Sequence, residues 1–134
     1  MGRHAFSIIE ILVVITIIGM VSAIAVPAHT KHMESAKVRV TRAETRVFAQ
    51  AARAYFLDAG DYPNTLEDLV QRHASTRKWH GPYLEDGLPP DPWDRPYNYD
   101  KPGTEQRSFD IYSYGQDGQP GGEGFAADIG HWIR

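Results

Sequence analysis

The sequence contains no cysteine, so no disulfide holds any part of this chain together. Exported domains of about a hundred residues often carry disulfides, because so short a chain builds only a modest hydrophobic core. Any additional cross-link that stabilises this chain must therefore be something other than a disulfide, and a bound metal ion is the first candidate.

Blocks of basic residues and catalytic motifs are also missing. The formal net charge is −3, which excludes nucleic acid as the obvious partner. The sequence has no nucleophile elbow, phosphate-binding loop or paired-carboxylate active site. We therefore expect no enzyme activity, and the 134 residues suffice for one domain and a membrane segment.

One long apolar run lies between Phe6 and Pro27, and Glu10 is its single acidic residue. A helix of about 21 residues spans about 31 Å, which is close to the hydrocarbon thickness of a bilayer. We therefore predict a transmembrane helix over residues 6–27.

A short basic leader, residues 1–5, precedes this run. It is too short for an ordinary secretory signal, and its small residue, Ala5, lies before the apolar run rather than after it. Cleavage between Ala5 and Phe6 would leave the apolar segment on the mature protein. Arg3 predicts that the leader stays in the cytoplasm and that the rest of the chain lies outside.

The Glu10 carboxylate costs free energy in such a segment unless a specific group pairs with it. Two interpretations remain open: the side chain reaches the lipid headgroups, or it pairs with a cation. The nearest cation is the α-amine of a chain that begins at Phe6. If that amine belongs to a neighbouring chain, the pair sets the axial step of a filament.

The remaining chain predicts an α+β fold, in which a long N-terminal helix packs on a small antiparallel sheet. The helix runs from about residue 7 to 58 and ends at Gly60, with a kink or local unwinding left open at Gly19 and Pro27. Its predicted buried stripe consists of Ala36, Val40, Ala43, Val47, Ala51 and Tyr55. The later predicted elements are a short helix from about Asn64 to Arg72, an ordered loop at 73–96, strands at 97–99 and 108–114, and a returning segment at 128–132.

A glycine-rich segment, residues 115–124, carries acidic residues in and beside it: Asp117, Glu123 and Asp128. Calcium prefers six to eight oxygen ligands and tolerates irregular geometry. The spacing is not that of an EF-hand, and spacing alone favours a solvated acidic turn over a metal site.

The segment Ala5-Phe6-Ser7-Ile8-Ile9-Glu10, with the apolar run after it, resembles the prepilin leader shared by type IV pilins and pseudopilins. In that family a prepilin peptidase cleaves before the residue matching Phe6 and methylates its new amine. The residue matching Glu10 is needed for assembly. Ala5 departs from the family, which usually has glycine before the cleaved bond.

Later segments resemble the major pseudopilin of type II secretion systems. They are Tyr55–Asp58, Asp61–Pro63, Leu88–Trp93, Asp110–Gly118, Gly121–Gly124 and Ala127–Trp132. The resemblance implies a type IV pilin-like fold and a structural subunit that polymerises into the periplasmic pseudopilus, which drives export of folded proteins across the outer membrane. The implied partners are further copies of the chain, minor pseudopilins, the prepilin peptidase, the inner-membrane secretion platform and, before assembly, membrane lipid.

The resemblance also changes the interpretation of the acidic loop, because major pseudopilins bind calcium there. It implies one Ca²⁺ ion, with Asp117 and Asp128 as side-chain ligands and Tyr114 offering its carbonyl. Glu123 or water would complete the set.

The implied organisation is a leader at 1–5, a transmembrane and assembly helix at 6–27, and a periplasmic globular domain at 28–134 that includes the amphipathic half of the helix. The precursor would cross the bacterial inner membrane once. A type IV pilin or minor pseudopilin is the nearest alternative, although pilins usually close their C-terminal region with a disulfide. A membrane-anchored periplasmic enzyme or ligand-binding module would need convergent polar groups, which the sequence does not show.

Overall fold

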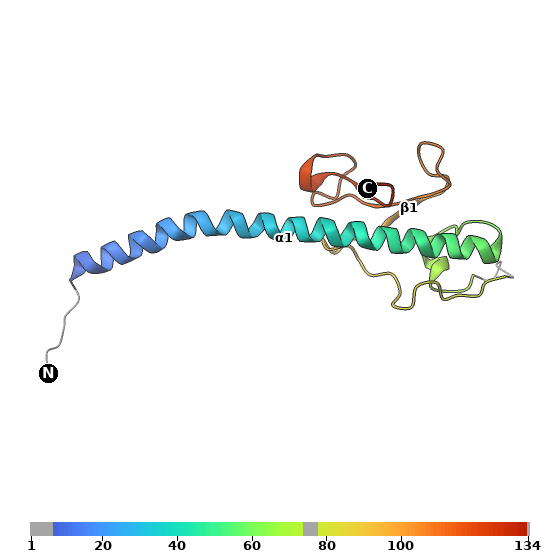
Figure 1. Cartoon of the computed structure of the whole chain (residues 1–134), viewed down its shortest axis with the longest axis horizontal. Coiled ribbons are helices and arrows are strands. Elements are labelled where there is room, and N and C mark those ends of the chain that lie inside the picture. The colour runs from blue at the N-terminus through green and yellow to red at the C-terminus, as the bar shows by residue number, and fades with distance from the viewer. Residues whose placement is uncertain (1–6, 74–77, 134) are drawn as a thin grey trace. The chain divides into compact units, whose positions relative to one another are not determined.

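The computed structural model describes residues 7–73 and 78–133, and the side chains of residues 24–29 are outside that description. The chain divides into two compact units, Met1–Glu34 and Ser35–Arg134. One helix, α1 (Ile8–Ala59), contributes to both (Figure 1). The helix continues without a break through Gly19 and Pro27, so the predicted long helix is confirmed.

Both ends of α1 have backbone hydrogen bonds that explain their position. At the start, the Ser7 carbonyl accepts from the N–H groups of Glu10 and Ile11 at 3.0 and 3.2 Å. At the end, the Gly60 N–H donates to the Phe56 carbonyl at 2.8 Å. Gly60 has φ +83°, a left-handed conformation that glycine adopts without steric cost, so the predicted stop is confirmed.

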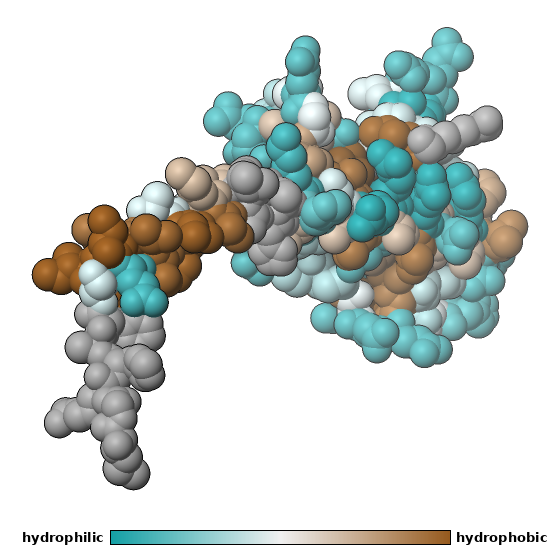
Figure 2. Space-filling view, turned by 60° about the vertical axis from the view of Figure 1, so that its left-hand side comes forward, coloured by the Kyte–Doolittle hydropathy of each residue, from teal (hydrophilic) through white to brown (hydrophobic). Residues whose placement is uncertain are grey.

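The first unit presents its apolar side chains to its surroundings. Ile8, Ile9 and Met20 are 81%, 69% and 65% exposed, and Figure 2 shows apolar residues over the visible face of this stretch. Among the described residues, no helix has the length and apolar character needed to cross a membrane. The predicted span at 6–27 includes residues outside that description, and it stays a prediction.

The second unit contains a three-stranded antiparallel sheet in the order β1-β2-β3. The strands are β1 (Asn98–Asp100), β2 (Asp110–Ser113) and β3 (Ile129–Gly130). Tyr99 lies opposite Ile111 in the first pair, and Ser113 lies opposite Ile129 in the second. The α+β prediction is confirmed: β1 has the predicted length and begins one residue later, whereas β2 and β3 are shorter than the sequence pattern indicated.

The core of the second unit lies between the sheet and the C-terminal half of α1. Phe48 meets Tyr97 edge-to-face, with ring centroids 5.0 Å apart. Ile111 of β2 and Leu69 are fully buried in the same cluster. The helix contributes its face at Thr41, Thr45, Phe48, Ala49, Ala52 and Tyr55.

The predicted buried stripe of α1 was wrong over most of its length. Ala51 and Tyr55 are buried as predicted, whereas Val40 and Val47 are 47% and 52% exposed and Ala43 is exposed as well. Ala36, the first residue of the predicted stripe, is only half-buried.

The reason is that two threonines occupy the buried face. The Thr41 hydroxyl donates to the Lys37 carbonyl at 3.0 Å, and the Thr45 hydroxyl donates to the Arg42 carbonyl at 3.2 Å. A threonine whose hydroxyl is bonded within its own helix can be buried without an unsatisfied polar group. The hydropathy pattern therefore predicted a buried face of α1 that is rotated away from the face that is actually buried.

The predicted helix at 64–72 is a shorter 3₁₀-helix, η1 (Leu66–Leu69). The Asp68 carboxylate accepts from the backbone N–H groups of Asn64 and Thr65 at 2.9 and 3.1 Å. This side chain fixes the start of the turn at Thr65, and the helix begins two residues later and ends three residues earlier than predicted.

Candidate functional site

Two regions carry the predicted functional residues: the start of α1 and the loop between β2 and β3. Ala5 and Phe6, the predicted processing site, lie outside the described residues. Glu10 is exposed in the first turn of α1, where a negative charge interacts favourably with the helix dipole. Its predicted pairing with the Phe6 amine stays a prediction.

A shallow apolar groove of about 290 Å³ runs along the same stretch of helix. It is lined by Ile9, Leu12, Val13, Thr16, Ile17 and Met20. The Thr16 hydroxyl donates to the Leu12 carbonyl at 2.7 Å, so this polar side chain uses its donor within the helix. The surface therefore suits contact with other apolar groups along the helix axis.

The loop between β2 and β3 has two limbs, residues 114–121 and residues 122–128, which hydrogen bonds join. The Gln116 N–H donates at 2.9 Å to the carbonyl of Phe125, which lies in the 3₁₀-helix η2 (Gly124–Ala126). Further along, Asp128 and Gly121 exchange two bonds: the Asp128 N–H donates to the Gly121 carbonyl, and the Gly121 N–H donates to Asp128 Oδ2 at 3.0 Å. These contacts close the loop without a disulfide.

The predicted metal ligands occupy different places in this loop. Tyr114 is half-buried just after β2, and Asp117 is exposed, with its Oδ1 accepting from the Gln119 N–H at 3.0 Å. Glu123 is exposed at the start of η2. Asp128 Oδ1 is buried and, within the described part of the chain, has no hydrogen-bond partner.

Across the described residues, no group of three or more carboxylate or imidazole side chains is placed to hold a metal ion. The structure therefore does not bring Asp117, Glu123 and Asp128 together as one cluster. Calcium accepts backbone carbonyls and water as well, so the ligand set stays a prediction.

Sequence reasoning missed the role of Asp91, which the pattern placed only in the ordered loop at 73–96. Asp91 is only 3% exposed, and its Oδ1 accepts from the N–H groups of Trp93 and Arg95 at 3.0 and 2.9 Å. The proline-flanked aspartate was the available signal, because such residues commonly close turns through their side chains.

A second buried carboxylate, Asp110, lies at the other end of β2. Burial raises its pKa, but hydrogen bonds from Arg107 and Thr104 outweigh burial and hold the pKa below its ordinary value. The Arg107 Nε donates to Asp110 Oδ1 at 2.6 Å. Nearby, burial lowers the pKa of His131, whose Nδ1 accepts from the Ile111 N–H at 3.2 Å.

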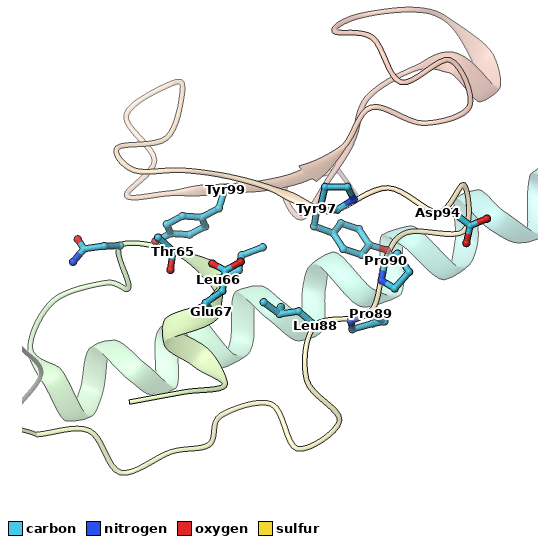
Figure 3. A pocket seen from close by; sticks show the side chains of 11 residues that line it. Thr65, Leu66, Glu67, Leu88, Pro89, Pro90, Asp94, Tyr97 and Tyr99 are labelled. Carbon is cyan, nitrogen blue, oxygen red and sulfur yellow. The ribbon is translucent and has the colours of Figure 1, made fainter. Parts of the chain in front are cut away.

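A cavity of about 510 Å³ lies between η1, the proline-rich segment (residues 88–96) and β1 (Figure 3). Leu66, Leu88 and Tyr99 contribute to its walls. The Tyr99 hydroxyl donates to the Pro63 carbonyl at 2.7 Å, so it serves the fold itself. The described lining residues include no histidine, cysteine or lysine, and we assign the cavity no chemistry.

Two models of known protein families match this chain and define its class. Residues 1–26 match the model of the prokaryotic N-terminal methylation motif, which agrees with the leader and long helix described above. Residues 28–132 match the model described as "Type II secretion system (T2SS), protein G". The chain belongs to this family of type II secretion system core proteins, and the resemblance predicted from its sequence is confirmed.

Individual relatives agree with this placement. A type II secretion system core protein G from Pseudomonas aeruginosa is 40% identical, over 97% of this chain and 95% of the relative. The protein of that name from Vibrio cholerae is 35% identical, over 97% and 92% of the two chains. The crystal structure of the major pseudopilin from the type 2 secretion system of enterohaemorrhagic Escherichia coli is similar with TM-score 0.63 and 29% identity, over 76% of this chain and 87% of that one.

Proposed function

We propose that this chain is a major pseudopilin subunit that polymerises through α1 into the periplasmic pseudopilus of a type II secretion system. The observation that carries this proposal is the apolar surface from Ile8 to Val21, which is exposed on α1 and lies within the residues that match the N-terminal methylation motif. Such a surface is unfavourable in water, so a subunit needs lipid or other subunits around it. The proposed role is structural.

The proposed pathway begins with an inner-membrane precursor whose C-terminal domain lies in the periplasm. A prepilin peptidase would cleave between Ala5 and Phe6 and methylate the new amine. Glu10 of one subunit would then pair with the Phe6 amine of another, which satisfies a charge that apolar surroundings otherwise make costly. Further proposed partners are minor pseudopilins and the inner-membrane secretion platform.

The second unit has an additional apolar row suited to subunit contacts. Val40 and Val47 lie seven residues apart on α1, are about half exposed, and have the exposed Ala43 and Ala54 in line with them. Seven-residue spacing places side chains along one side of a helix, where a neighbouring helix or loop can pack. This exposed row supports assembly through both halves of α1.

We also propose that the loop between β2 and β3 binds one Ca²⁺ ion. The buried, unpartnered Asp128 Oδ1 fits this role, because an anionic oxygen without a donor is costly unless a cation lies beside it. Asp117, Glu123 and the Tyr114 carbonyl are the other proposed oxygen ligands. Bound calcium would supply a strong local charge that fixes a loop without disulfides.

Mass spectrometry of the protein purified from its own membranes tests the processing step. We expect a mature chain that begins at Phe6 and carries one additional methyl group on its amine. A chain that retains residues 1–5 would contradict the proposed pathway.

Thermal unfolding of the full-length protein in detergent tests the calcium proposal. Ligand binding to the folded state stabilises it by RT ln(1 + [L]/Kd), so calcium should raise Tm and a chelator should lower it. Magnesium at the same concentration is the control, since it demands a stricter octahedral geometry. An unfolding curve that calcium leaves unchanged would contradict the metal assignment.

A further inference from the structure

Arg95 reaches from the proline-rich segment to the first residues of the loop between β2 and β3. Its Nη1 donates to the Gly115 carbonyl and its Nη2 donates to the Gln116 carbonyl, both at 2.8 Å. Tyr114 and Asp117 are the residues on either side of this pair. We infer that Arg95 is a positioning residue for calcium, because it fixes the limb of the loop that carries two proposed ligands. This inference rests on the proposed calcium binding.

The same limb is held from a second side by Asp91. Asp91 Oδ2 accepts from the Ser113 hydroxyl, and the Ser113 Oγ in turn accepts from the Gly115 N–H at 3.1 Å. Asp91 also forms the turn that orients Arg95, because it accepts from the Arg95 N–H. Gly115 is therefore linked to one short segment directly at its carbonyl, through Arg95, and indirectly at its N–H, through the Ser113 hydroxyl. Asp94 marks the position of this segment in Figure 3.

Holding Gly115 also sets the separation of the two limbs. A Cβ at Gly115 would lie 2.7 Å from the Ala127 carbonyl oxygen, so the limbs pass each other at close range. Asp128 follows Ala127 directly. The place of Asp117 relative to Asp128 thus depends on contacts that Arg95 and Asp91 provide.

The loop needs such contacts because its backbone is unusually free. Five of its glycines have positive φ: Gly115, Gly118, Gly121, Gly122 and Gly124. Glycine-rich chain loses much conformational entropy when a ligand orders it, and that loss weakens binding. Charge-assisted bonds from a guanidinium to two successive carbonyls order part of the loop before the ion arrives.

The contact between Arg95 and Gly118 offers a second way to disturb this arrangement. A Cβ placed on Gly118 would overlap the guanidinium of Arg95. By contrast, a Cβ on Gly124 of the same loop meets nothing within 4 Å. The two glycines have similar backbone conformations, with φ +68° and +62°, so substitution strains each of them to a similar degree.

The first experiment measures calcium affinity of the full-length protein in detergent by isothermal titration calorimetry. Arg95→Met keeps the aliphatic stem and removes the guanidinium, and we expect calcium Kd to rise about tenfold or more. Arg95→Lys should restore part of this loss, because an ammonium can still bond one carbonyl. Arg39→Met, at an exposed position of α1, should leave calcium Kd unchanged.

A second readout separates positioning from general stability. In calcium-free Arg95→Met, we expect faster amide hydrogen exchange at residues 117–122 with little change in Tm. A lower Tm with an unchanged calcium Kd would mean that Arg95 is merely structural and would overturn the inference. If the wild-type chain itself binds no calcium, the proposed metal site fails and the inference fails with it.

A double-mutant comparison gives a second test, which disturbs the arrangement from the loop glycines and then repeats the comparison without the guanidinium. Gly118→Ala should weaken calcium binding more than Gly124→Ala does, because it also displaces the guanidinium. When Arg95 is already Met, this excess should disappear. Equal effects of the two alanines in the wild-type background would contradict the role of Arg95.

Discussion

The two halves of α1 differ in how their apolar side chains are covered. After Thr41, one face of the helix is covered by its own domain, where Phe48 and Ala52 are 3% and 0% exposed. Near its start, Ile9 and Ile17 are 69% and 55% exposed. A single helix therefore contains one segment that completes a fold and another that requires lipid or further subunits. The difference teaches that apolar content alone does not tell a core from an interface.

The largest expected effect comes from Glu10→Ala, which removes the only acidic side chain in the apolar run. We expect loss of filaments in electron micrographs, because the proposed pair with a neighbouring amine cannot form. The Tm of the second unit should not change. Glu67→Ala, which removes an exposed carboxylate of η1, is the matched control and should leave filaments intact. Normal filaments from the Glu10 variant would disprove the proposed pairing.

Truncation of a buried side chain should have the next largest effect. Ile111→Ala should lower the free energy of unfolding by about 2–5 kcal/mol, since it removes methyl groups from a fully buried site. Ile17→Ala removes the same groups from the exposed half of α1, and it should leave that free energy unchanged while weakening assembly. Urea unfolding followed by circular dichroism measures both variants. Equal losses of stability would remove the distinction between the two halves.

The pH dependence of stability should be smaller. Burial favours the neutral ring of His131, so its folded pKa lies below the ordinary value of about 6.5. The unfolded chain then binds a proton more readily, and stability falls as pH drops below about 6.5. Asp110 has a lowered folded pKa, and its contribution is lost only at pH below about 4. We expect Tm to fall by a few degrees between pH 7 and pH 5.

His131→Gln supplies the control for this pH prediction. The variant should lose most of the Tm change between pH 7 and pH 5 and should keep the steeper loss at lower pH. A Tm that rises on mild acidification of the wild-type protein would show the sign to be wrong.

The smallest expected effect tests the corrected orientation of α1. Val47→Ser changes a side chain that is 52% exposed, so the free energy of unfolding should change by no more than about 0.5 kcal/mol. The same measurement on Phe48→Ala should show a loss of about 3–5 kcal/mol. A large loss at Val47 would favour the stripe that the hydropathy pattern indicated.

Much of the fold could be predicted from sequence because its signals are local. Gly60 ends α1 through its own backbone conformation, and Asp68 starts η1 through bonds to residues just before it. The buried face of α1 could not be predicted in this way, because Thr41 and Thr45 are buried with their hydroxyls bonded inside the helix. Hydropathy counts such residues as polar, and only the tertiary fold shows which face is covered.

The candidate sites also differ in how much of each can be predicted from local sequence. Glu10 is evident from sequence, because a lone acidic residue in an apolar run is costly and therefore conspicuous. The bonds of Arg95 join residues about twenty positions apart, and no local pattern indicates them. The acidic loop lies between these cases: its carboxylates are visible in the sequence, whereas the buried oxygen of Asp128 is visible only in the structure.

Photo-cross-linking from the exposed half of α1 tests most directly the claim that this surface is completed by further copies of the chain. A benzophenone amino acid at Ile17, activated in assembled pseudopili, should yield adducts in which mass spectrometry identifies a second copy of this chain. The same probe combined with Glu10→Ala should lose that adduct. Adducts to other proteins alone, at equal yield with and without Glu10, would contradict the account.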